Sequence, residues 1–304
     1  VPVERILVTS GASGGLVLLA SLLLDAGDEL LITDPGYPCN EVFAKLVGGV
    51  PIKLPVSAEN RFQPTLADIQ NAWGDKTKGV LLASPANPTG TMLDAGELIA
   101  IQSFVTAKGG FFILDEIYQN LTRDHVSYTS GLSLCSDIYV LNSFSKFFGM
   151  TGWRLGWLVV PETAVAALTK LAQNLFISPS TPAQYAAISA FNTDAMSIHK
   201  QRRGVFEDRA KILAEGLLEL GFRIPVMPDG AFYLYVDISH TKMDSADFCW
   251  RLIEEYKVAA TPGYDFGDSN AGQYVRFAYT TSEESILLGL ERIGTALKDW
   301  GLQA

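Results

Sequence analysis

Five apolar runs with almost no polar interruption constrain the fold of this chain more than any other feature. They are nearly continuous in hydrophobicity rather than alternating, which is typical of strands covered on both faces in a parallel-rich sheet. Segments with helical periodicity fall between them, at 40–47, 94–107 and 162–174. This alternation predicts an α/β layered sheet. The predicted strands are Glu29–Asp34, Gly79–Ser84, Phe111–Glu116, Ile138–Asn142 and Gly156–Val160.

After about Ser178 the pattern changes to a long polar helix followed by shorter elements. The charged helical stretch covers 198–221, and the elements after it suit a small α+β domain. We therefore predict two domains, a large one over 1–190 and a smaller one over 191–304. The elements predicted after the long helix are strands Ala231–Val236 and Tyr274–Tyr279, a strand near Val258, and helices Ser245–Tyr256 and Glu283–Trp300.

Composition limits the classes of function. The chain has 304 residues, of which 48% are hydrophobic and 18% charged, so it predicts an ordinary globular protein with a well-buried core. A net charge of −10 argues against nucleic acid or an anionic membrane as the main partner. No run has the length and purity of a transmembrane helix. The cysteines match neither a metal site nor a disulfide framework, which favours a reducing, cytoplasmic compartment; they are Cys39, Cys135 and Cys249.

A glycine- and serine-rich motif precedes the first predicted helix. This motif, TSGASGG (Thr9–Gly15), leads into an apolar run at 16–27, which predicts a helix buried on most sides and stopped by Gly27. Small residues let backbone N–H groups approach a ligand, and a helix N-terminus favours an anion. The motif lacks the G-K-[ST] of a P-loop and breaks the dinucleotide pattern after Gly11. In isolation a plain Gly/Ser helix cap is the commoner explanation.

One lysine follows a predicted strand, among hydroxyl groups and close to a guanidinium. The run SFSKFFGMTGWRLG places Lys146 after Ser143 and Ser145, with Arg154 following. An amine in this setting can form a Schiff base with a carbonyl cofactor while its neighbours hold an anion. An isolated S-x-S-K run is more often a serine-rich turn with a surface lysine. The remaining polar residues of the chain therefore decide between the two interpretations.

Polar side chains also stand at the ends of two other predicted strands. Asn87, in SPANPTG, lies at the carboxyl edge where open α/β sheets bind ligands, although an Asn bonded to its own backbone fits equally well. Asp115 ends the run FFILD, and Tyr118 follows it. A buried carboxylate needs a partner, which a protonated ring nitrogen would provide. A metal would lack nearby His or Cys ligands, and a helix cap is the structural alternative.

An arginine interrupts the last apolar strand. Arg276, in QYVRFAY, either faces solvent or clamps a carboxylate in a bidentate manner. The other groups match a single ligand when taken together. Lys146 suits an aldehyde, and the helix N-terminus with the serines and Arg154 suits a phosphate. Asp115 suits a basic ring nitrogen, while Asn87 and the nearby tyrosine suit a phenolic oxygen. Pyridoxal 5′-phosphate carries all of these groups.

The order of the motifs resembles that of the class I/II pyridoxal-phosphate-dependent aminotransferases of fold type I. The resemblance covers essentially the whole chain and includes DPGYP, SPANPTG, DEIY, SFSKFFGMTGWRLG, PDGAFYLYVDI, TPGYDFG and QYVRFAY. It implies a large domain with a mostly parallel mixed sheet between helices, plus a smaller C-terminal α+β domain. It also implies an enzyme that moves an amino group between an α-amino acid and a 2-oxo acid by a ping-pong mechanism.

By position, the resemblance implies a role for each candidate residue. Lys146 is the Schiff-base lysine, and Asp115 and Tyr118 share the catalytic work at the cofactor ring. Arg276 binds the substrate α-carboxylate together with Asn87, and no metal is implied. The residues implied to bind the cofactor are Ala12, Ser13, Tyr37, Asn87, Asp115, Tyr118, Ser143, Ser145, Lys146 and Arg154.

The resemblance further implies a homodimer, because the active sites of this family lie at the subunit interface. Family members carry a segment before the TSGAS motif that contributes to the small domain, touches the substrate and reaches the partner's phosphate. That segment is absent from the printed chain, and a Phe pair follows Lys146 where a small or hydroxyl residue is common first. We therefore expect substrate recognition to be the property that this sequence defines least.

Two alternatives share the same cofactor residues. A C–S lyase or an aminocyclopropane-carboxylate synthase-like lyase uses the same fold and motifs, which cannot separate it from a transaminase. A regulator-type cofactor-binding domain would carry a DNA-binding head, but the chain has no helix-turn-helix or basic segment. The amino acid and 2-oxo acid used are not defined by the motifs.

Overall fold

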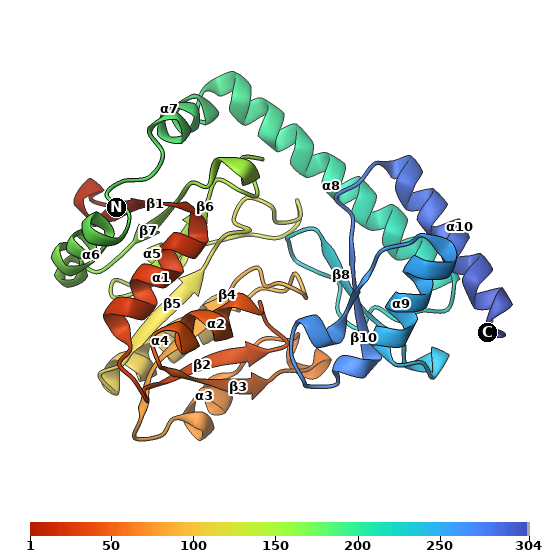
Figure 1. Cartoon of the computed structure of the whole chain (residues 1–304), viewed down its shortest axis with the longest axis horizontal. Coiled ribbons are helices and arrows are strands. Elements are labelled where there is room, and N and C mark those ends of the chain that lie inside the picture. The colour runs from red at the N-terminus through yellow and green to blue at the C-terminus, as the bar shows by residue number, and fades with distance from the viewer. Residues whose placement is uncertain (303–304) are drawn as a thin grey trace.

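The computed structural model describes residues 1–302, and most of the strands form one large sheet (Figure 1). The strands of this sheet are β1 (Ile6–Thr9), β2 (Glu29–Asp34), β3 (Val50–Pro55), β4 (Thr77–Ala83), β5 (Phe111–Asp115), β6 (Tyr139–Ser143) and β7 (Gly156–Val159). Their order is β1-β7-β6-β5-β4-β2-β3. Pairing is parallel from β3 through β2, β4 and β5 to β6, and β7 is antiparallel to both neighbours. The predicted mostly parallel sheet is confirmed.

Helices cover both faces of this sheet. One face packs against α1 (Gly11–Leu23), α2 (Cys39–Leu46) and α6 (Glu162–Leu175), and the other against α3 (Leu66–Ala72), α4 (Ala95–Ala107) and α5 (Gly131–Leu134). Val80 and Leu82 of β4 enter the core under α4, whereas Leu81 enters the core under α1. Because successive strand residues point to opposite faces, both cores need apolar side chains. Two buried faces therefore explain the uninterrupted apolar runs, and each buried Leu or Val contributes about 1.5–3 kcal/mol.

The first helix differs from the expectation. It begins at Gly11 and ends at Leu23, so the last five residues of the TSGASGG motif lie inside the helix rather than before it. Gly27 lies beyond the helix, in a turn with φ of 88°. Its predicted role as the helix stop is therefore wrong, because the extended Leu24 already ends the helix.

A second, smaller sheet follows the long helix α8. It contains β8 (Tyr233–Asp237), β9 (Thr261–Pro262) and β10 (Tyr274–Ala278), in the antiparallel order β8-β10-β9. The helices around it are α8 (Thr193–Glu219), α9 (Ser245–Tyr256) and α10 (Glu283–Asp299). The predicted strand near Val258 is wrong: residues 257–260 have no regular structure. Lys257 ends α9 in a left-handed conformation, which is not the extended backbone of a strand. Val258 packs into the core directly after this turn.

The two sheets meet through α8 and through a small apolar cluster. Figure 1 shows α8 running from α7 (Thr181–Ala190), beside the large sheet, to the helices around the small sheet. The cluster joins Val56 and Phe62 from the large side with Val226, Tyr235 and Phe266 from the small side. The boundary that we propose at 190/191 falls between α7 and α8. Within residues 1–302, no helix has both the length and the apolar character needed to cross a membrane.

Candidate active site

The predicted residues gather where the central parallel strands end. β5 ends at Asp115, the turn with Asn87 follows β4, and Ser143 ends β6 shortly before Lys146. Since β4, β5 and β6 are neighbours in the sheet, their carboxyl ends open onto one site. The motif with Tyr37 follows β2, on the other side of β4. Sheet topology alone therefore brings together residues from four separate motifs.

Lys146 is enclosed by aromatic side chains. Its Nζ lies 5.5 Å from the ring centre of Tyr118 and 5.4 Å from that of Phe232. Burial lowers the pKa of the Lys146 amine; the Asp115 carboxylate opposes this, while Arg276 and Arg154 add to it. A lowered pKa leaves more of the amine neutral, which is the form that attacks a carbonyl carbon. The surface-lysine interpretation does not describe this position.

Asp115 is a buried carboxyl group with few partners. It is 5% exposed, and its Oδ1 accepts a hydrogen bond from the backbone N–H of Ile117 at 2.9 Å. Burial raises the pKa of Asp115 to about 7, against the opposing effects of this hydrogen bond and of Lys146. Among the described residues, no group of His, Cys, Asp and Glu side chains could hold a metal ion. A protonated ring nitrogen fits this under-satisfied carboxyl group.

The N-terminus of α1 approaches an arginine across two glycines. A Cβ at Gly11, whose φ is 73°, would lie 2.6 Å from Nη2 of Arg154. A Cβ at Gly156 would lie 2.9 Å from the backbone nitrogen of Ala12. The glycines thus let the guanidinium and β7 lie close to the first turn, which also carries Ser13. A helix N-terminus beside a guanidinium suits a phosphate group.

Two serines line the same edge. Ser143 pairs with Gly156 across β6 and β7, and Gly156 pairs with Thr9 just before α1. The Ser143 hydroxyl lies 2.9 Å from the Ser145 hydroxyl, and it also accepts from the Ser145 backbone N–H at 3.0 Å. These hydroxyls are buried donors beside the helix N-terminus. They fit the remaining oxygen atoms of a phosphate.

Arg276 faces the site rather than solvent. Its Nη1 donates to Oδ1 of Asn87 at 2.8 Å, and its Nη2 donates to the hydroxyl of Thr261 at 3.3 Å. The guanidinium carbon lies 4.2 Å from the ring centre of Tyr233 and 4.7 Å from that of Phe266. Its buried Nε has no hydrogen-bond partner among the described residues. Asn87 therefore orients the arginine, which leaves guanidinium N–H groups for a carboxylate.

Tyr233 and Phe266, which the sequence analysis did not single out, complete the site together with Phe232. The hydroxyl oxygens of Tyr118 and Tyr233 lie 3.0 Å apart, and burial raises the pKa of both phenols. Phe232 and Phe266 contact Lys146 and Arg276 respectively. These residues belong to the PDGAFYLYVDI and TPGYDFG motifs, which carried the only sequence signal for them.

The DPGYP motif joins the two halves of the site. The carboxylate of Asp34, which is buried, accepts from the backbone N–H groups of Asp268 and Ser269 at 3.1–3.3 Å. The backbone N–H of Gly36 donates to the carbonyl of Phe266 at 2.8 Å. The motif therefore presents Tyr37 from the large sheet, and it also holds the loop in which the ring of Phe266 packs on Arg276.

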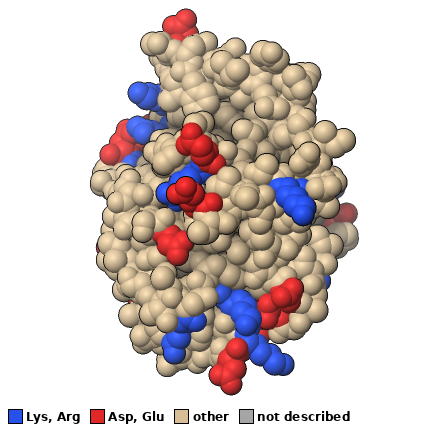
Figure 2. All heavy atoms as spheres, turned by 90° about the vertical axis from the view of Figure 1, so that its left-hand side faces the viewer, with Lys and Arg blue, Asp and Glu red and all other residues tan. Residues whose placement is uncertain are grey.

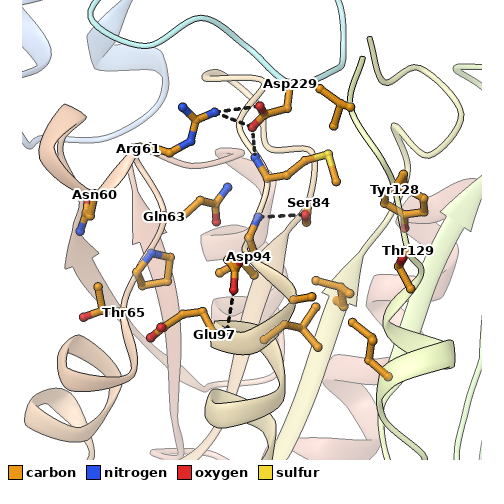
Figure 3. Close-up of a pocket in the computed structure, with 18 of the residues that line it drawn as sticks. Asn60, Arg61, Gln63, Thr65, Ser84, Asp94, Glu97, Tyr128, Thr129 and Asp229 are labelled. Atoms are coloured by element: carbon orange, nitrogen blue, oxygen red, sulfur yellow. Dashed lines mark hydrogen bonds and ion pairs between the residues drawn. The ribbon is translucent and has the colours of Figure 1, made fainter. Parts of the chain in front are cut away.

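A separate hollow of about 820 Å³ lies outside this constellation (Figure 3). Its rim includes the Arg61–Asp229 ion pair at 2.8 Å, and Asp229 also accepts from the backbone N–H of Met92. Ser84 accepts from the backbone N–H of Leu93 on the inner wall. None of the predicted cofactor or substrate residues lines this hollow. The candidate active site is defined by its side chains and not by the volume of a cavity.

Comparison with known proteins identifies the class. The family described as "Aminotransferase class I and II" matches residues 1–293. A valine–pyruvate aminotransferase of Mycobacterium tuberculosis is 37% identical over 298 residues, covering 97% of this chain and 76% of that relative. An aspartate aminotransferase of Geobacillus stearothermophilus is 34% identical, covering 95% and 75%. The crystal structure of an aminotransferase from M. tuberculosis matches with a TM-score of 0.95 at 36% identity, covering 98% and 77%.

The chain belongs to the class I and II aminotransferases, and it has the fold type I architecture of that family. It is accordingly an enzyme that transfers amino groups. It spans about three quarters of the length of the relatives reported above. The predicted family and fold are confirmed, and no finding favours the lyase or regulator alternatives.

Proposed function

We propose that this aminotransferase binds pyridoxal 5′-phosphate through Lys146 and uses it to exchange amino groups between an α-amino acid and a 2-oxo acid. One observation carries the proposal. A half-buried amine, Lys146, and a buried carboxyl group, Asp115, share a single site with an inward-facing arginine, Arg276. Each group keeps hydrogen-bonding or bonding capacity that its present contacts leave unused, and one cofactor with one substrate carboxylate would take it up.

The cofactor would be held at both ends and along its ring. Ala12, Ser13 and Arg154 suit the phosphate together with the serines of β6, and Tyr37 suits the face of the ring. Asp115 suits the ring nitrogen, and Tyr118 with Asn87 suits the phenolic oxygen. When bound, the cofactor supplies an electron-poor ring that takes up the electron pair released from the substrate Cα.

The residues of the chain would then manage protons and orientation. Asp115, once paired with the ring nitrogen, keeps a proton on that nitrogen and so keeps the ring electron-poor. Lys146, as a free amine beside the substrate, would remove the Cα proton. The same amine would deliver that proton to the cofactor carbon on the far side of the substrate nitrogen. With a 2-oxo acid the residues act in the reverse order.

Arg276→Leu is expected to raise KM for the amino acid by roughly 10²-fold or more, because a carboxylate loses its charged hydrogen-bond partner. Arg276→Lys should recover only part of the affinity, since an ammonium group lacks the bidentate geometry. Steady-state kinetics with the kcat and KM effects separated provide the measurement. Arg251→Leu is the matched control, because this guanidinium pairs with Glu255 on α9. Equal KM values in all these variants would exclude Arg276 as the carboxylate site.

A single half-reaction tests transamination directly. An amino acid alone should convert the absorbance of the cofactor bound to Lys146 into that of its amine form, and a 2-oxo acid should restore it. Valine, aspartate and aromatic amino acids form a suitable donor panel, with pyruvate and 2-oxoglutarate as acceptors. Release of ammonia and a 2-oxo acid from the amino acid alone, without any acceptor, would identify a lyase instead.

We also propose a homodimer. Figure 2 shows that the face carrying the N-terminal strand and α6 has few charged side chains. Ile6, Val8, Leu175 and Ile177 are exposed there, and Ile177 is 85% exposed. Contact with a second copy would bury such a surface. Sedimentation of the cofactor-loaded protein at twice the chain mass is expected, and a monomer under those conditions would contradict the proposal.

We place the enzyme in the cytoplasm. Its cysteines are all free, with Cys135 and Cys249 buried, as suits a reducing compartment. Cell fractionation would test this location, and recovery with a secreted fraction would contradict it.

A further inference from the structure

We propose that Tyr233 is a positioning residue that connects the contact on the phenolic oxygen of the cofactor with the arginine that binds the substrate carboxylate. This inference rests on the proposed function, because it takes the place of the cofactor from Lys146 and Asp115. Tyr233 is the first residue of β8 in the small sheet, so it contacts the large-sheet site from the opposite side.

Among residues 1–302, the hydroxyl of Tyr233 has one hydrogen-bond partner. Its oxygen lies 3.0 Å from that of Tyr118, and both side chains are buried, with 6% and 4% exposure. If the Tyr118 hydroxyl donates to the phenolic oxygen of the cofactor, its own oxygen is free to accept a hydrogen bond from Tyr233. Hydrogen bonds in such a chain polarise one another, and burial strengthens the effect. Tyr233 would thus make Tyr118 a better donor.

The ring of Tyr233 has a different partner. The guanidinium carbon of Arg276 lies 4.2 Å from its centre, and Phe266 contacts the same guanidinium at 4.7 Å. A guanidinium over aromatic faces gains stability and loses freedom to turn. Asn87 fixes one edge of the guanidinium by the hydrogen bond to Nη1. The aromatic pair and the amide therefore aim the remaining N–H groups at the substrate side.

Core packing alone does not explain a tyrosine at this position. The next residue back, Phe232, lies in the same apolar cluster with no hydroxyl group. Burying an extra hydroxyl is unfavourable unless it forms a hydrogen bond. Burial raises the pKa of the Tyr233 phenol, and the hydrogen bond with Tyr118 and the charge of Arg276 oppose that rise, so the hydroxyl and the ring each contact a different partner. The hydroxyl and the ring thus have separable roles.

The test uses two readouts on the cofactor-loaded enzyme. The first is the pH midpoint of the absorbance of cofactor bound to Lys146. The second is the Kd of 2-methylalanine, an α-amino acid with no Cα proton. A hydrogen bond to the phenolic oxygen stabilises its negative charge, which is greatest after the lysine-bound nitrogen loses its proton. Weakening that bond therefore raises the midpoint.

Tyr233→Phe is expected to raise the midpoint by about half a unit to one unit, the equivalent of one buried hydrogen bond, and to leave the Kd unchanged. Phe266→Leu should do the opposite, weakening 2-methylalanine binding by roughly threefold to tenfold with an unchanged midpoint. Adding Tyr233→Phe to Tyr118→Phe should produce no further shift, because the link is already broken.

Three results would overturn the inference. A Tyr233→Phe enzyme that retains the absorbance and titrates like the wild type would refute the link and leave the proposed function standing. A wild-type protein with no absorbance from cofactor bound to Lys146 would refute both. An equal shift from Tyr233→Phe with and without Tyr118 would show that the hydroxyl acts by another route.

Discussion

Lys146→Ala is expected to abolish covalent attachment of the cofactor and to lower kcat by roughly 10⁴-fold, the upper range for loss of an acid–base group. The reason is local. This amine alone is proposed to bond the cofactor and to carry the Cα proton, and burial lowers its pKa. The measurements are the visible absorbance of the loaded protein and the single-turnover rate with excess amino acid.

The control for this substitution is Lys170→Ala, an exposed lysine on α6. It should retain the absorbance and the wild-type rate. Added methylamine should partly restore turnover in Lys146→Ala, since a free amine can enter the vacated space and carry the proton. A Lys146→Ala enzyme with unchanged kcat would show that another group performs both tasks.

Asp115→Asn is expected to impair the cofactor-loaded enzyme and to stabilise the cofactor-free protein. In the loaded enzyme an amide cannot keep the ring nitrogen protonated, so kcat should fall by about 10²- to 10⁴-fold. Cofactor affinity should fall as well. The neighbouring Glu116→Gln is the control, because its carboxylate accepts hydrogen bonds from the Ser130 hydroxyl and the Gly131 backbone N–H and is not one of the proposed cofactor residues. It should leave cofactor affinity unchanged.

In the cofactor-free protein the same substitution should increase stability at neutral and alkaline pH. The folded-state pKa of Asp115 is raised from 3.8 to about 7 by burial. The stability that this carboxyl group contributes is therefore fully present below about pH 4 and is lost as pH rises through about 7. Asp115→Asn should gain on the order of 4 kcal/mol over the wild type at pH 8. The gain should vanish below pH 4.

Denaturant unfolding of both proteins at several pH values, with and without cofactor, provides the measurement. Added pyridoxal phosphate should stabilise the wild type more than the variant at pH 8, since the ring nitrogen then pairs with the carboxylate. Identical pH dependence of the two cofactor-free proteins would contradict the assignment of a raised pKa. Equal stabilisation by the cofactor would contradict the ring-nitrogen contact.

The parts of the fold that the sequence predicts are those buried on both faces. The central strands β4, β5 and β6 have continuous apolar runs because each contributes to two cores. The edge strands β1 and β3 were missed because their burial is mixed, with Val50 and Ile6 exposed. The prediction of a strand near Val258 was wrong for a related reason. A β-branched residue packed in a core does not reveal whether its backbone pairs with a neighbour.

The residues of the site also divide into those that the sequence predicts and those that it does not. Lys146 and Asp115 stand next to strands, so their positions followed from the chain pattern and the sheet order. The contact between Arg276 and Asn87 joins residues 189 positions apart, and no local pattern encodes it. The same holds for the Tyr118–Tyr233 pair, separated by 115 positions. Such contacts depend on how the two sheets dock, which periodicity does not specify.

Borohydride reduction of the cofactor-loaded enzyme, followed by peptide mapping, tests the central claim most directly. Reduction converts the link between lysine and cofactor into a stable bond, so the modified residue can be read from the peptide mass. The adduct is expected on Lys146 alone, in the peptide that contains SFSKFFGMTGWR. An adduct on another lysine, or none in an enzyme that still transaminates, would contradict the account.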